Sequence, residues 1–117
     1  MLVLASILLL LLGITHSYLG ERYILTRLFK NESLPHLYGS DAFTKGTLRF
    51  AWHITSIAWF GTAFILAFDD QHSNIFLLST GLVFLLSAFF SAFYTKGKHF
   101  SWIIFLSISL LILLSER

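Results

Sequence analysis

The sequence predicts an all-α, polytopic membrane protein with four transmembrane helices in a small antiparallel bundle. Hydrophobic residues make up 56% of the 117 residues and charged residues only 12%, whereas a soluble domain is typically about one quarter charged. The apolar residues form long stretches separated by polar connections, and most basic residues lie in those connections. The length accommodates one membrane domain, residues 1–117, and no second domain.

The long apolar stretches set the expected spans. A transmembrane helix needs about 17–25 residues to cross the hydrocarbon core of a bilayer. The four expected spans cover about residues 2–19, 50–68, 74–94 and 100–114. The last of them is short for a span. Because only brief polar breaks separate the second, third and fourth spans, these helices are expected to be antiparallel neighbours.

The first connection, about residues 20–49, is long for a small bundle. Apolar and basic residues alternate at helical spacing from Glu21 to Lys30, which predicts an amphipathic helix at the membrane interface. The alternative is a solvated linker. Pro35 ends such a helix, and Gly39–Asp41 then predicts a turn or an N-cap that opens a short helix leading into the second span.

Basic residues set the expected orientation. Seven of the eight lie in two connections on the same side of the membrane: Arg22, Arg27, Lys30, Lys45, Arg49, Lys96 and Lys98. By the positive-inside rule, the connections at about residues 20–49 and 95–99 are cytoplasmic and both termini lie outside. The expected location is the bacterial inner membrane. Such clustering is typical of membrane topology, so no nucleic-acid partner is expected.

His16 lies within the first span, about one helical turn from its cytoplasmic end. Ionisable side chains at that depth are costly and usually have a function. Gly13, His16 and Gly20 follow the i, i+3, i+7 spacing of one helix face. Because small residues let a second helix approach closely, this face is expected to point into the bundle.

His53 lies at matching depth in the second span. Arg49, His53 and Ser56 share one helix face because they are spaced i, i+4, i+7. A second stripe is expected on the opposite side of this helix, made of Trp52, Thr55, Trp59 and Thr62. Its deeper tryptophan, Trp59, is expected to be a packing or pocket residue.

The two histidines predict a ligand, metal or haem site in the cytoplasmic half of the bundle, because imidazole binds transition metals and ligates haem. The candidate metal ligands are His16, His53, Glu21 and His99, and the candidate cofactor-binding residues are His16, His53 and Arg49. Arg49 would attract an anionic group, such as a haem propionate, a lipid phosphate or a quinone-linked partner. Glu21 follows His16 at i+5, so the two converge only if the helix breaks near Gly20. The competing interpretation is that each histidine hydrogen-bonds a neighbouring carbonyl or serine.

The residue types that are missing restrict the chemistry. The chain has no cysteine, which excludes disulfides, thiolate metal sites and cysteine catalysis. It also lacks the H-E-x-x-H, G-x-S-x-G and Walker-type patterns, so no catalytic residue is assigned and an enzymatic activity stays open. The sequence favours a ligand-binding membrane protein. The alternatives are an accessory subunit of a larger membrane complex and a small homo-oligomeric transporter or channel.

Overall fold

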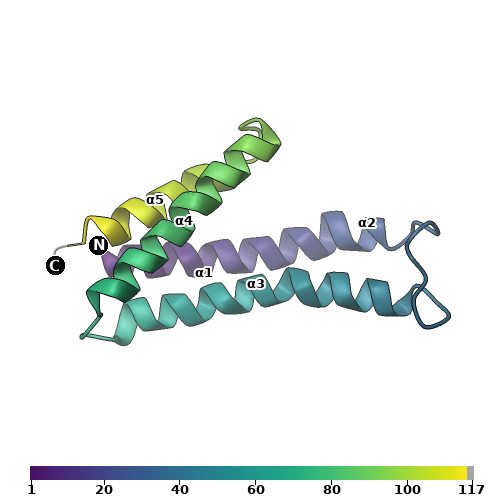
Figure 1. The fold of residues 1–117 in the computed structure, drawn as a ribbon, viewed down its shortest axis with the longest axis horizontal. Helices are drawn as coiled ribbons and strands as arrows, with labels where there is room; N and C mark the ends of the chain where they lie inside the picture. Colours follow the sequence, from purple (N-terminus) through teal and green to yellow (C-terminus); the bar gives the residue numbers. More distant parts are fainter. Residues whose placement is uncertain (116–117) are drawn as a thin grey trace.

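The computed structural model describes residues 1–115, and all of their regular elements are helices (Figure 1). The elements are, in order, α1 (Leu2–Leu19), η1 (Gly20–Leu25), α2 (Thr26–Leu28), α3 (Ala42–Phe68), α4 (Asn74–Thr95) and α5 (Ser101–Leu113). Of these, η1 is a π-helical turn. The all-α prediction is therefore confirmed for the described residues.

Three helical segments are long and apolar enough to cross a membrane: Leu2–Leu28, Ala42–Phe68 and Asn74–Thr95. The bounds of α1 and α4 agree within one residue with the first and third predicted spans. The last helix, α5, lies within the fourth predicted stretch but has only 13 residues. That length is below the roughly 17 residues of a complete span, so length and composition support three of the four predicted spans.

The connection between α1 and α3 begins as a continuation of α1. The segment predicted as a helix over Glu21–Lys30 is helical as far as Leu28, but η1 and α2 extend α1 without a break, so it is not a separate helix. In η1 the N–H of Thr26 donates to the carbonyl of Glu21 five residues earlier. A hydrogen bond over five residues widens the turn relative to an α-helix.

The start of α3 follows the turn that the sequence predicts at Gly39–Asp41. Gly39 has a φ of +89°, a left-handed conformation that glycine adopts without strain. Asp41 occupies the N-cap position and forms an ion pair with Lys45 at 2.6 Å. The hydrogen bond from the Lys45 ammonium holds the pKa of Asp41 below its usual value. From Ala42, α3 runs into the predicted second span without interruption, as the sequence indicates.

The long helices form two antiparallel hairpins, α1 with α3 and α4 with α5, as Figure 1 shows. The start of α1, the end of α5 and the connection 69–73 lie together, at what is called here the termini end. The connections 29–41 and 96–100 lie at the other end of each hairpin, called here the loop end. The pairing of α4 with α5 agrees with the prediction. The expected pairing of the second and third spans is wrong, because α3 packs along α1 and not along α4. The hairpins diverge toward the loop end and do not form one closed bundle along their length.

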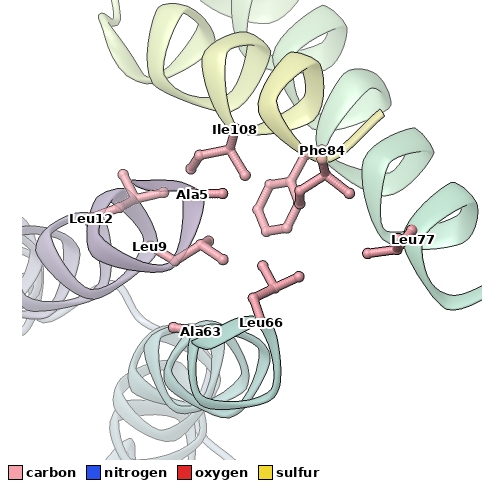
Figure 2. Packing of buried hydrophobic residues seen from close by; sticks show 9 residues of the cluster. Ala5, Leu9, Leu12, Ala63, Leu66, Leu77, Phe84 and Ile108 are labelled. Carbon is pink, nitrogen blue, oxygen red and sulfur yellow. The ribbon is translucent and has the colours of Figure 1, made fainter. Parts of the chain in front are cut away.

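The hydrophobic core lies at the termini end, where all four helices meet (Figure 2). Its buried side chains are Ala5, Leu9, Leu12, Ala63, Leu66, Leu77, Phe84, Ile108 and Ile112. Two buried serines link helices there: Ser6 donates to the carbonyl of Ala63, and Ser109 donates to the carbonyl of Gly81, each at 2.8 Å. Toward the loop end α1 and α3 pack mainly against each other, and this is where the predicted site residues lie.

Candidate functional site

The face of α1 that carries Gly13 and Gly20 points into the protein, as predicted, and the helix that it meets is α3. A Cβ atom at Gly13 would overlap the ring of Phe60, and a Cβ atom at Gly20 would overlap the indole of Trp52. This close approach lets the Trp52 Nε1–H donate to the carbonyl of His16 at 3.0 Å. The absence of a side chain at Gly20 thus allows the tryptophan of one helix to hydrogen-bond the backbone of the other.

Beside this contact, charged side chains connect the two helices. The Arg49 guanidinium donates to both carboxylate oxygens of Glu21, with the shortest distance at 2.8 Å from Nη2 to Oε1. Nε2 of His53 lies 3.0 Å from the second oxygen, Oε2. Arg49 and His53 both reach this carboxylate because i and i+4 side chains share one helix face.

The hydrogen bonds continue from His53 toward the membrane interior. Nδ1 of His53 lies 2.9 Å from Oγ of Ser17, and Ser17 donates to Oγ of Ser56 at 2.8 Å. Ser56 is buried, with 1% of its surface exposed. We call the five connected residues, Ser17, Glu21, Arg49, His53 and Ser56, the polar network.

His53 joins the two parts of the polar network through both of its ring nitrogens. Nε2 lies beside the Glu21 carboxylate, and Nδ1 lies beside the Ser17 hydroxyl. The imidazole therefore connects the exposed ion pair of Glu21 and Arg49 to the buried hydroxyl of Ser56.

His16 lies among aromatic rings next to the polar network. Its imidazole stacks on the Trp52 indole with 4.7 Å between ring centroids and 6° between planes, and Trp59 meets it edge-on at 5.0 Å. Trp59 in turn contacts Phe105 of α5 at 5.6 Å, and Phe105 contacts the core residue Phe84 at 6.0 Å. We call His16, Trp52, Trp59 and Phe105 the aromatic cluster.

The tryptophan stripe of α3 was expected on the side opposite Arg49, His53 and Ser56, and this expectation is wrong. Trp52 and Trp59 contact His16, while His53 contacts Ser17, so both stripes face α1. At 100° per residue the two stripes lie roughly a quarter turn apart. One neighbouring helix can therefore contact both of them. Trp59, expected to be a packing or pocket residue, packs against the hydrophobic core.

The structure brings only part of the predicted site together. Glu21 and His53 lie in contact, whereas the His16 ring contacts tryptophans and His99 lies 2.8 Å from the Ser101 hydroxyl through Nδ1. Within residues 1–115 no group of three or more His, Cys, Asp or Glu side chains is arranged to hold a metal ion. Arg49, expected to attract an anionic ligand, is paired with Glu21.

Ser17 is the network residue that sequence reasoning missed. The available signal was its spacing: Ser17 and Glu21 are i and i+4 on α1, which places them on one face. His53 lies between them on the partner helix and bonds both. The spacing of Gly13 and Gly20 indicated instead the adjacent face of α1, where His16 lies.

Replacing Ser17 tests how much the network stabilises the hairpin. Ser17→Ala removes the partner of buried Ser56 and of Nδ1 of His53, so we expect a loss of about 1 kcal/mol. The measurement is equilibrium unfolding of the purified protein in mixed micelles. Thr55→Ala is the matched control, since the Thr55 hydroxyl bonds the Ala51 carbonyl of its own helix. An equal loss in both variants would contradict a role for the network in joining the helices.

The comparisons with known proteins give no family assignment. No protein-family model matches the chain, and no curated protein or solved structure matches it. The polar network and the aromatic cluster are therefore the observations from which a function is proposed.

Proposed function

We propose that the protein is a four-span protein of the bacterial inner membrane, with the connections at 20–49 and 95–99 in the cytoplasm and both termini outside. Seven of the eight basic residues lie at the loop end of the hairpins, which supports this orientation. The fourth span is α5, which packs against α1 and α4 through buried Ile108 and Ile112. It therefore lies at the same depth as the other helices.

The proposed activity is the binding of a hydrophobic ligand at the loop end of the α1–α3 hairpin. The observation that supports it is the position of the aromatic cluster beside the polar network, with His16 and His53 each about one helical turn from the end of an apolar stretch. Ionisable groups at this depth are costly, and aromatic side chains with a few polar groups are typical of ligand sites. The ligand would lie against His16 and Trp59, where α5 diverges from α1.

The ligand that best suits these residues has a planar ring and a hydrogen-bond acceptor, as a quinone headgroup has. Ligation of haem or a metal by His16 and His53 together would require His53 to give up its bonds to Ser17 and Glu21. A planar ring can instead stack against the aromatic cluster and accept one hydrogen bond from His16, and the polar network then stays intact. The quinone class is therefore proposed in preference to a two-histidine metal or haem site.

Replacing His16 tests this proposal. In lipid nanodiscs, a short-chain benzoquinone should quench the emission of the tryptophans saturably, because Trp52 and Trp59 lie beside His16. We expect His16→Leu to weaken binding of the benzoquinone about tenfold, because a tenfold change in affinity corresponds to the loss of one hydrogen bond of roughly 1.4 kcal/mol.

His72→Leu is the matched control, since His72 also stacks on an aromatic ring, Phe76, but lies at the termini end. Quenching that is unsaturable, or equally weakened in both variants, would refute the proposal. A Soret band in the protein as purified, lost in His16→Leu and kept in His72→Leu, would identify haem as the planar ligand in place of a quinone.

A second candidate function is that of an accessory subunit in a larger membrane complex. The divergence of the hairpins favours it, since the loop-end half of α4 carries exposed large side chains, Phe89, Phe93 and Tyr94. The mass of the particle extracted in mild detergent distinguishes the candidates. A monomer supports the binding protein, a hetero-complex supports the subunit, and a homo-oligomer supports the transporter or channel considered from the sequence.

A further inference from the structure

A groove runs along the end of α1, the π-helical turn and α2, and none of its lining residues comes from α3. Its volume is about 480 Å³, and its lining residues are Tyr18, Glu21, Arg22, Tyr23, Thr26 and Arg27. The groove begins at the last residues of the apolar stretch Leu2–Leu19. It therefore lies at the boundary between hydrocarbon and water, where lipid headgroups are found.

The π-helical turn accounts for the two arginines being together. Residues i and i+5 lie about 140° apart around an α-helix, which would place Arg22 and Arg27 on different sides. In η1 the turn closes over five residues, so i and i+5 come toward one side. The guanidinium carbons of Arg22 and Arg27 lie 5.7 and 5.8 Å from the centroid of the same ring, that of Tyr23.

The charge of the groove is positive. Glu21 lines it, but its carboxylate is paired with Arg49 and His53. Within residues 1–115 neither Arg22 nor Arg27 belongs to an ion pair. The two guanidiniums are thus available to an anion, and contact with the Tyr23 ring restricts their freedom before one binds.

We propose that this groove binds the phosphate of an anionic phospholipid headgroup. Two guanidiniums present donors in the planar arrangement that phosphate oxygens accept. Tyr18 and Tyr23, at the membrane boundary, lie where the glycerol and the upper acyl chain would pass. The proposal is independent of the ligand proposed for His16, because the groove and the aromatic cluster share no residue.

The test measures lipid retained by the full-length protein. Native mass spectrometry would follow binding of phosphatidylglycerol, phosphatidylcholine and inorganic phosphate to detergent-solubilised protein. We expect the protein to retain phosphatidylglycerol in preference to phosphatidylcholine, and millimolar inorganic phosphate should not compete. In Arg22→Gln/Arg27→Gln the affinity for phosphatidylglycerol should fall roughly 30-fold, the effect expected for two basic residues at a membrane surface. The affinity of Arg22→Lys/Arg27→Lys should lie between those of the wild type and the glutamine variant, because lysine keeps the charge but not the forked donors of arginine.

Lys96→Gln/Lys98→Gln is the matched control, since it removes two charges from the other basic connection at the loop end. This control should keep the wild-type affinity for phosphatidylglycerol. An equal loss in both double variants would mean general attraction to a basic surface and would overturn the proposal. Binding of inorganic phosphate without lipid retention would also overturn it. Circular dichroism and the thermal midpoint of each variant show whether it is folded. If the glutamine variant does not fold, the comparison of Arg22→Lys/Arg27→Lys with the wild type still tests the proposal.

Discussion

Substituting alanine for Gly20 should separate α1 from α3 and destabilise the protein by about 1–3 kcal/mol, the usual cost of overpacking an interior. The added Cβ would occupy the position of the Trp52 indole. The indole would have to leave the His16 carbonyl and its stacked position on the His16 ring. Equilibrium unfolding in mixed micelles, followed by helical circular dichroism, measures the loss.

Gly61→Ala provides the matched control for this substitution. Gly61 also lies in a membrane helix, but a Cβ atom there has no neighbour within 4 Å in the described structure. Alanine is the better helix former by up to about 1 kcal/mol, so this variant should be unchanged or more stable. In a double-mutant cycle, Trp52→Ala should relieve most of the cost of Gly20→Ala. Additive effects of the two substitutions would contradict the close packing described for this pair.

Replacing Glu21 with leucine should destabilise the hairpin by about 2 kcal/mol. The variant leaves both Arg49 and His53 without their carboxylate, and charge-assisted hydrogen bonds contribute about 1.5–3 kcal/mol. The low part of that range applies because 49% of the Arg49 side chain and 36% of the Glu21 side chain are exposed, and exposure weakens ion pairs. The same unfolding measurement reports the effect.

Three further variants define the origin of the Glu21 effect. Glu21→Gln should lose less than Glu21→Leu, because the amide oxygen still accepts a hydrogen bond. Glu21→Leu/Arg49→Leu should recover part of the loss, since the arginine left unpaired by the single variant is then absent. Glu32→Leu is the control, as Glu32 belongs to no ion pair within residues 1–115. A loss from Glu21→Leu no larger than that of the control would contradict the role assigned to Glu21.

The sequence predicted those features that depend on composition along one helix. Hydropathy gave the bounds of α1 and α4 within one residue, because the lipid-facing side chains fix where a span begins and ends. Spacing on single helices predicted that Gly13, His16 and Gly20 lie on one face that points toward another helix, and the structure shows that this helix is α3. The same spacing rule placed Arg49 and His53 on one face of the second span. In the structure both side chains bond Glu21.

Features that depend on the rotation of one helix against another could not be predicted in this way. Distance from the ends of the spans placed His16 and His53 at matching depth, but the pairing of α1 with α3 puts Ser17, and not the His16 ring, opposite His53. The π-helical turn was also missed, because a hydrogen bond over five residues leaves no periodicity in so short a segment. The contact of α5 with α1, which joins the two hairpins, was also not predicted, because local patterns do not contain it.

The short length of α5 has a consequence for the surrounding lipid. At 1.5 Å per residue, its 13 residues extend about 20 Å, whereas the apolar residues 50–68 of α3 extend about 29 Å. A hydrocarbon layer about 30 Å thick matches the second length and not the first. As the proposed fourth span, α5 would require a thinner bilayer on its side of the protein alone. The orientation of the protein and its neighbours in the membrane should then depend on acyl-chain length.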